Sequence, residues 1–164
     1  MSWARRIWVN GPTRPPIAFP VDRLNEILGM KPHEVANQEK INAGLQAVLA
    51  AYSKQGFIDA TIRPAVSLDS DTRLVAYDAA IDEGIQYKMG ELHITGLADK
   101  TAGGLLKKWP IKPGQLFDGT VPDEFVRKVA APKVAQPGKA PPAVEAQLKR
   151  DKENAKVDVT LAFR

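Results

Sequence analysis

The sequence predicts an α+β protein of two tandem β-α-α-β-β units, each a three-stranded mixed sheet with two helices packed on one face. The first observation behind this is an internal repeat, in which apolar positions and a Lys-Pro pair recur 81 residues later at similar spacing. The repeat pairs Leu24, Leu28, Met30-Lys31-Pro32 and Val35 with Leu105, Trp109, Ile111-Lys112-Pro113 and Leu116. That period is too long for a solenoid unit and suits two small domains. The second observation is that both halves show the same order of helical and alternating patterns. We therefore expect domains at residues 1–84 and 85–164.

The first half opens with a short strand and a proline-rich connector. Residues 7–9 are an apolar run that ends at Asn10-Gly11, which is typical of a strand entering a turn. Four prolines follow within residues 11–20, and proline lacks a backbone donor and disfavours a helical residue before it. That segment is expected to be extended. Residues 21–28 then carry apolar side chains at helical spacing, with Gly29 placed to end the helix.

The strongest helical signal spans residues 37–55. Its apolar side chains form one stripe at helical spacing: Ile41, Leu45, Val48, Leu49 and Tyr52. Asn37 is suited to cap the start of this helix, and Gly56 to end it in the left-handed backbone region. Two alternating runs, residues 60–68 and 73–82, follow and predict a β-hairpin.

The second half repeats this order. A strand is expected at residues 86–95, followed by a turn at Gly96. The first helix is expected from about Asp99 to Trp109. Two alternating runs at residues 144–148 and 157–163 close the chain and predict a second hairpin.

The second half also contains one departure from the repeat. A short second helix is expected to begin near Pro122, because proline is tolerated in a first helical turn. From about residue 130 to 142 the chain is rich in Pro, Ala, Lys and Gly, which predicts an exposed proline-rich insert instead of the long helix of the first half.

Composition narrows the function classes. The chain has 164 residues, of which 44% are hydrophobic and 26% charged, as in globular proteins. It has no cysteine, which excludes disulfides, a zinc cluster and a thiol nucleophile. The net charge of +4 comes from 23 Lys and Arg against 19 Asp and Glu, and the positive residues are spread along the chain. No run of 18 apolar residues or secretory signal is present, so the chain read literally is soluble and cytoplasmic; read as a segment of a longer precursor, it could belong elsewhere.

The chain offers little catalytic or metal chemistry. His33 and His93 are its only histidines, and neither has a second ligand at metal-binding spacing. Asp69 and Asp71 lack the downstream glycine and glutamate of a calcium loop and suit a hairpin turn. The adjacent carboxylates of Asp82-Glu83 diverge to opposite faces at a strand end, so they do not aim at one substrate bond. We therefore expect a non-enzymatic protein with no cofactor, metal or small-molecule substrate.

Basic and tryptophan residues suggest one alternative function, a cytoplasmic nucleic-acid-binding module. Lys107-Lys108 precede Trp109, and Arg5-Arg6 lie between Trp3 and Trp8, so charge and stacking surfaces occur together. The chain lacks a GXXG clamp and an aromatic strand motif of RNA-binding domains, and Trp109 occupies the repeat position of a leucine, which implies burial. Nucleic acid is therefore the less favoured partner.

Three segments carry a family resemblance. Residues 52–60 combine an aromatic late in a helix, a glycine stop and an aromatic entering a strand, and residues 81–84 end a hairpin with Ile-Asp-Glu-Gly. Residues 87–96 resemble the first strand of a following repeat, and residues 112–118 an inter-helix segment. Together they resemble the POTRA (polypeptide-transport-associated) domains of outer-membrane β-barrel assembly factors. The resemblance weakens after Phe125, where the insert replaces the expected long helix.

The resemblance implies a periplasmic scaffold or chaperone arm for outer-membrane protein assembly, associated with the outer membrane as a fragment of a longer precursor. Its partners would be unfolded outer-membrane proteins or proteins of the assembly complex. No series of alternating ten-residue strands follows in this chain, so the membrane would be reached only through a barrel outside it.

The resemblance also places the first strand of each closing hairpin at a sheet edge, where an extended peptide can add as a further strand. The edge at residues 60–68 contains Pro64, which removes one backbone donor. We therefore expect partner binding at the second such strand: Ala143, Val144, Glu145, Ala146, Gln147, Leu148, Lys149 and Arg150. The residues expected to shape turns and the junction are Gly56, Glu83, Gly84 and Gly96.

Overall fold

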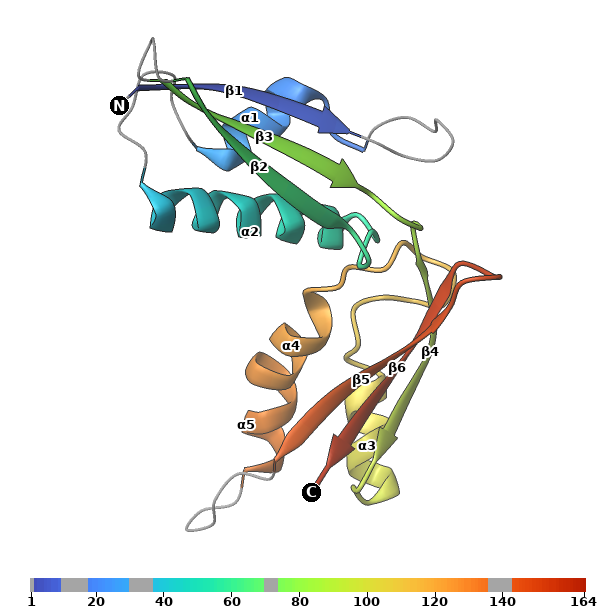
Figure 1. The fold of residues 1–164 in the computed structure, drawn as a ribbon. Helices are drawn as coiled ribbons and strands as arrows, with labels where there is room; N and C mark the ends of the chain where they lie inside the picture. The colour runs from blue at the N-terminus through green and yellow to red at the C-terminus, as the bar shows by residue number, and fades with distance from the viewer. Residues whose placement is uncertain (1, 10–17, 30–36, 70–73, 136–142) are drawn as a thin grey trace. The chain divides into compact units, whose positions relative to one another are not determined.

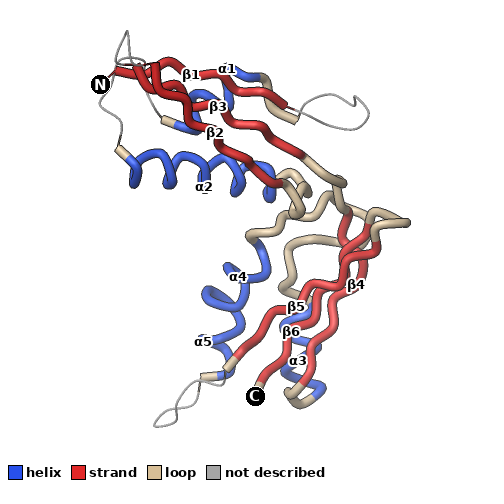
Figure 2. Tube along the Cα trace, in the orientation of Figure 1, coloured by secondary structure: helices blue, strands red, loops and turns tan. Residues whose placement is uncertain are grey.

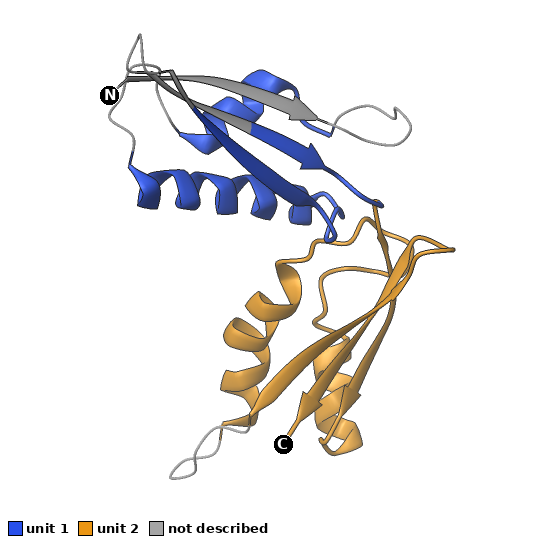
Figure 3. Ribbon diagram, viewed as in Figure 1, with its two compact units in different colours: residues 1–85 blue, residues 86–164 orange. Residues whose placement is uncertain are grey.

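The computed structural model describes residues 2–9, 18–29, 37–69, 74–135 and 143–164. The chain divides into two compact units, Met1–Ile85 and Gln86–Arg164 (Figure 3). Each unit combines helices with one three-stranded sheet of mixed strand direction, so the predicted α+β class is confirmed (Figures 1 and 2). The division between the units falls one residue later than the repeat suggests. Among the described residues, no helix has the length and apolar character needed to cross a membrane.

The first unit has the order β-α-α-β-β. Its elements are β1 (Ser2–Val9), α1 (Val21–Leu28), α2 (Gln38–Lys54), β2 (Thr61–Asp69) and β3 (Leu74–Asp82). The sheet order is β1-β3-β2, in which the central β3 runs parallel to β1 and antiparallel to β2. The last strand of the chain segment is therefore central, and β2 lies at an edge, as the resemblance implied.

The two helices of the first unit begin and end near the predicted positions. Gly29 follows α1 with a φ of 66°, and its N–H bonds back to the carbonyls of Asn25 and Glu26. Asn37 caps α2, since its side-chain oxygen accepts a hydrogen bond from the N–H of Lys40 at 3.1 Å. The unit's core consists of buried residues from both helices and β3: Leu24, Leu28, Ile41, Val48, Tyr52 and Ile81.

A close helix crossing supports this core. A Cβ added to Gly44 in α2 would lie 2.4 Å from the carbonyl oxygen of Leu28 at the end of α1. Only glycine allows the two backbones to approach so closely, and the absent side chain lets the helices bury their apolar stripes against each other. Gly44 was not singled out from the sequence, because nothing local marks a helical glycine as a contact point.

The second unit repeats the sheet topology. Its elements are β4 (Lys88–Thr95), α3 (Asp99–Leu106), α4 (Val121–Phe125), the π-helical turn η1 (Val126–Ala130), α5 (Ala131–Val134), β5 (Val144–Asp151) and β6 (Lys156–Phe163). The sheet order is β4-β6-β5, with β6 parallel to β4 and antiparallel to β5. The central strand β6 alternates buried and partly exposed residues, and its buried side chains are Val157, Val159, Leu161 and Phe163.

Two helix boundaries predicted for the second unit are wrong. The first helix ends at Leu106 rather than Trp109, because Trp109 precedes Pro110 and a residue before proline disfavours helical backbone angles. The predicted insert does not begin at residue 130, because α4, η1 and α5 form one continuous helical segment through Val134. The rest of the insert, residues 136–142, lies outside the described residues.

The π-helical turn explains how the helix continues past Pro132. A proline inside a helix lacks the N–H donor, and its ring crowds the carbonyl four residues earlier. Here the N–H of Ala131 bonds to the carbonyl of Val126, five residues back, so the turn before the proline is widened. The wider turn accommodates the proline ring, which sequence reasoning treated as a helix breaker.

Candidate functional site

The edge strand β5 presents a regular row of backbone groups. It is the terminal strand of the second sheet, and its eight residues pair with β6 without a register shift. Just before it, Ala143 and Arg164 exchange both backbone hydrogen bonds, at 3.1 and 2.9 Å. Because hydrogen-bonded and non-bonded pairs alternate in an antiparallel ladder, Val144, Ala146 and Leu148 direct their N–H and C=O groups away from β6. No described segment pairs with this outer side.

The side chains along this edge alternate in character. Val144, Ala146 and Leu148 lie opposite the buried β6 residues Phe163, Leu161 and Val159, and are half-buried on the same, helix-covered face (Figure 1). Between them, the exposed side chains on the other face are Glu145, Gln147 and Lys149. A strand added here would therefore place every second side chain beside an apolar face and the others in water.

The opposite edge of the same sheet is partly sealed by the chain itself. Met89 in β4 donates its N–H to the carbonyl of Gln115 at 2.8 Å and accepts from the N–H of Gly114 at 2.7 Å. The N–H of Phe117 bonds to the carbonyl of Tyr87 at 3.1 Å. The segment after α3 thus occupies the outward groups at the start of β4, and only Leu92–Thr95 remains as an uncovered terminal stretch.

A β-bulge separates these two parts of β4. The register with β6 shifts between Met89 and Leu92, and the Asp158 carboxylate of β6 accepts the N–H of Glu91 at 2.7 Å. A Cβ added to Gly90 would lie 2.0 Å from that carboxylate oxygen, so only glycine fits here. Bulges bend and twist a strand, which protects an edge from further pairing. A glycine inside a predicted strand was the available signal for this feature, and sequence reasoning did not use it.

The edge of the first unit is less suited to an added strand. The nine residues of β2 pair with β3, and Pro64, opposite Ala79, contributes no donor. From Arg63 to Ser67 the side chains are exposed on both faces, and Val66 is 60% exposed. An incoming strand would find one fewer hydrogen-bond donor there and little apolar surface beside it.

Gly56 ends α2 in a complete Schellman motif. Its φ is 85°, its N–H bonds to the carbonyl of Ser53 at 3.1 Å, and the N–H of Phe57 bonds to the carbonyl of Tyr52 at 3.0 Å. The rings of Tyr52 and Phe57 meet edge to face, with centroids 5.9 Å apart. The aromatic-glycine-aromatic pattern therefore closes the helix and packs its end at the same time.

Glu83 and Gly84 lie at the end of β3, within the first unit. One carboxylate oxygen of Glu83 accepts the N–H of Ala18 at 2.9 Å, which ties the segment before α1 to the end of the sheet. Gly84 has a φ of 68°, and its N–H bonds to the Asp82 carboxylate at 3.2 Å. The described partners of these residues are local, and their effect on the junction between the units stays a prediction.

The buried Tyr52 hydroxyl is influenced by the same carboxylate. Burial, and to a smaller degree hydrogen bonding and charge from Glu83, raise the pKa of Tyr52 above its ordinary value of 10.0. By strict geometry the hydroxyl has no hydrogen-bond partner among the described residues, so the interaction with Glu83 is long. We read Tyr52 as a neutral core residue at neutral pH.

The described residues do not assemble a metal or nucleic-acid site. Within them, no group of three His, Asp or Glu side chains could hold a metal ion. His93 is exposed and lies 3.4 Å from the Glu91 carboxylate, while His33 and Asp71, and the side chain of Asp69, lie outside the described part.

The stacking surfaces of the nucleic-acid alternative are also not found together. Trp109 is half-buried and packs against Phe125, with ring centroids 5.0 Å apart, although Lys107-Lys108 are exposed. The side chains of Trp3, Arg5-Arg6 and Trp8 are not described.

Fold and edge together define a protein-interaction module of two β-α-α-β-β units. Residues 16–84 match the POTRA family model, whose description is "Surface antigen variable number repeat". The POTRA resemblance drawn from residues 52–60 and 81–84 is therefore confirmed, and POTRA domains of Omp85 and BamA proteins are periplasmic protein-interaction modules. No curated protein matches the sequence.

Solved structures extend the fold match to the whole chain. POTRA domains 3 to 5 of Haemophilus influenzae BamA match with a TM-score of 0.78 and 17% identity, over 99% of this chain and 65% of that one. Haemophilus ducreyi BamA lacking POTRA domains 1–3 matches with a TM-score of 0.77 and 12% identity, over 100% of this chain and 29% of that one. POTRA domains 1 and 2 of the periplasmic domain of Anabaena Omp85 match with a TM-score of 0.57 and 9% identity, over 98% and 94%. Such low identities show a shared fold, and this chain spans 65% or less of the two BamA chains.

Proposed function

We propose that the chain is a non-enzymatic, periplasmic scaffold or chaperone arm that binds extended segments of outer-membrane proteins, or of their assembly partners, by strand addition to β5. The observation that carries this is the contrast between the two edges of the second sheet. Val144, Ala146 and Leu148 present outward backbone groups on β5, whereas Tyr87 and Met89 on β4 already bond to the chain's own segment.

The alternation of β5 indicates the kind of segment that fits. An added strand has its side chains on the same two faces as β5, so it meets apolar residues on one face and polar residues on the other. Strands of outer-membrane barrels alternate apolar and polar residues with a period of two. Backbone pairing tolerates many sequences, which suits a protein that holds several clients.

The experiment compares two substitutions in β5. Ala146→Pro removes an outward N–H without removing a bond to β6, and it is expected to weaken binding of an alternating apolar-polar peptide roughly tenfold. Gln147→Ala, the matched control, changes an exposed side chain and keeps the edge backbone, so its affinity should equal that of the unsubstituted protein. Both variants are first compared by thermal unfolding.

Peptide chemistry gives an independent check. Methylating peptide nitrogens at alternate positions blocks the hydrogen bonds to β5 in one register only, and shifting the methyl groups by one residue restores them. If both methylated peptides bind as well as the parent peptide, strand addition at β5 is wrong. Binding that is lost in Gln147→Ala and kept in Ala146→Pro contradicts the proposal in the same way.

A further inference from the structure

The excess positive charge of the chain belongs to the second unit. Residues 86–164 contain fourteen Lys and Arg against nine Asp and Glu, a net charge of +5, whereas residues 1–85 contain nine against ten. The positive residues that seemed spread along the sequence therefore divide unevenly between the two folded units. A charge excess of this kind steers binding toward acidic partners when the charges also gather on one surface.

Part of this excess surrounds a shallow depression beside the helices. The depression is lined by Lys108, Lys128, Val129, Pro132 and Lys133, which come from the end of the α3 segment, from η1 and from α5. All three lysines are exposed, and the half-buried Val129 and the exposed Pro132 supply an apolar surface between them. None of the five residues belongs to β5, so this surface is independent of the proposed strand-addition edge.

A glycine in α3 leaves room for one of these ammonium groups. A Cβ added to Gly104 would lie 2.9 Å from the Nζ atom of Lys133 and 3.7 Å from its Cε atom. The Lys133 side chain therefore reaches from α5 across the backbone of α3, toward the end of the helix that Lys108 follows. This brings two ammonium groups from distant parts of the sequence to one surface.

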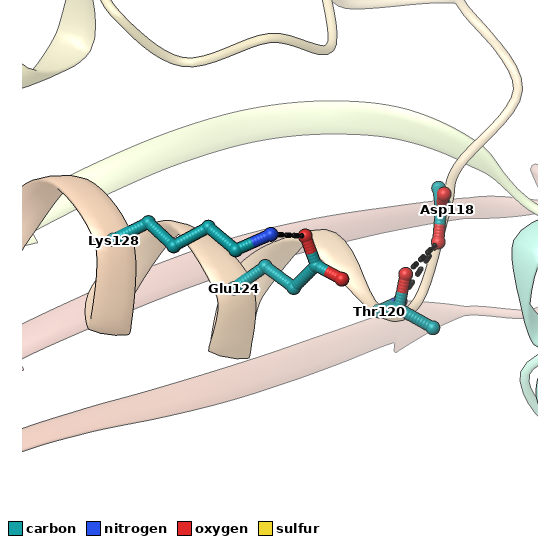
Figure 4. Close-up of polar contacts among 4 residues, drawn as sticks. All are labelled: Asp118, Thr120, Glu124 and Lys128. Carbon is teal, nitrogen blue, oxygen red and sulfur yellow. Dashed lines mark hydrogen bonds and ion pairs between the residues drawn. The ribbon is translucent and has the colours of Figure 1, made fainter.

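Only one of the three lysines has a carboxylate partner among the described residues. Lys128 donates to Glu124 at 2.7 Å, an i to i+4 pair along the helix (Figure 4). In the same region the Asp118 carboxylate accepts from the N–H and hydroxyl of Thr120, at 2.9 and 2.7 Å, and so serves the turn before α4 (Figure 4). Within the described part of the chain, no acidic side chain forms an ion pair with Lys108 or Lys133.

We propose that this lysine depression docks an acidic segment of a partner protein, with an apolar side chain over Val129 and Pro132 and carboxylates beside Lys108 and Lys133. Compact ammonium groups around a small apolar floor match separate carboxylates flanking an apolar residue. Trp109 does not supply a stacking platform for bases, because its ring is packed against Phe125. A flat membrane surface would not use the concave floor.

The test uses the whole chain and a fluorescent peptide of Glu-Leu-Glu-Pro repeats, whose prolines prevent strand pairing with β5. The double variant Lys108→Glu/Lys133→Glu is compared with Lys100→Glu/Lys152→Glu, which changes the net charge equally at two exposed lysines outside the depression. We expect the first to raise the Kd roughly tenfold at low salt and the second to leave it within about twofold. Thermal unfolding shows that both variants are folded.

Several outcomes would overturn the proposal. Equal weakening by the two double variants would mean that the peptide senses only net charge. Absence of peptide binding at low salt, or binding only to vesicles containing phosphatidylglycerol, would assign the surface no protein partner. Loss of the alternating strand peptide in Ala146→Pro, with retained binding of the proline-containing peptide, would separate this site from the β5 edge.

Discussion

The carbonyl oxygen of Phe163 lies 2.0 Å from the position that a Cβ atom on Gly96 would occupy. Gly96, which follows β4, also has a φ of 82°, in the left-handed region. The turn after the first strand of the second unit is therefore packed against the end of its central strand. Both the backbone angle and the lack of space require glycine at this position.

Gly96→Ala is accordingly expected to destabilise the second unit by about 2–4 kcal/mol, from left-handed strain and the clash with Phe163. The matched control is Gly103→Ala in α3, where a Cβ would meet nothing within 4 Å. That substitution is expected to be neutral or to stabilise by up to about 1 kcal/mol through helix propensity. Urea unfolding of the two variants measures the difference, and equal free energies of unfolding would contradict this reading of Gly96.

The β4 bulge gives a prediction about coupling. Gly90→Ala is expected to destabilise by about 1–3 kcal/mol, because the new methyl group meets the Asp158 carboxylate. Asp158→Ala loses the hydrogen bond to Glu91 and is expected to cost about 1 kcal/mol. In the double variant the methyl group has space, so the two costs should add to more than the measured total. Strict additivity in urea unfolding would show that the carboxylate does not limit position 90.

Tyr52 gives a prediction about pH. Its pKa is raised on folding, so the folded state holds the hydroxyl proton more tightly, and stability falls as the pH rises above the unfolded value of about 10. Tyr52→Phe removes this titration, so the extra loss of stability of the unsubstituted protein above pH 10 should be absent in the variant. Glu83→Gln should reduce the loss only in part, since burial is the larger cause. Parallel pH dependence of all three proteins in urea unfolding would refute the assignment.

Local signals in the sequence predicted much of the fold. Gly29, Asn37 and Gly56 each act on the backbone within a few residues, and the helices they bound begin and end close to the predicted positions. The order of elements and the edge position of the two hairpin strands also followed, the latter through the POTRA resemblance.

Features that depend on distant contacts were not predicted. Gly44 and Gly90 are explained by a carbonyl and a carboxylate from other elements, and the cover over β4 comes from residues 114–117. The helix through Pro132 was missed because a widened turn offsets the local effect of proline. For the same reason the sequence suggested β5 as the better edge from Pro64 alone, without the sealed edge of β4.

Amide hydrogen exchange tests the geometry of the edge in the free protein. Val144, Ala146 and Leu148 direct their N–H groups outward, so they should exchange faster than Glu145, Gln147 and Lys149, whose N–H groups bond to β6. Uniform protection along the strand would mean that another segment already covers this edge. The experiment needs no ligand and therefore checks the site before any partner is known.

The most direct test of the central claim is the same exchange measurement after addition of an extended peptide with alternating apolar and polar residues. We predict that the amides of Val144, Ala146 and Leu148 become protected while the amides of β2 remain unchanged. Protection confined to residues 61–69, or no new protection in β5 at saturating peptide, would contradict strand addition at this edge.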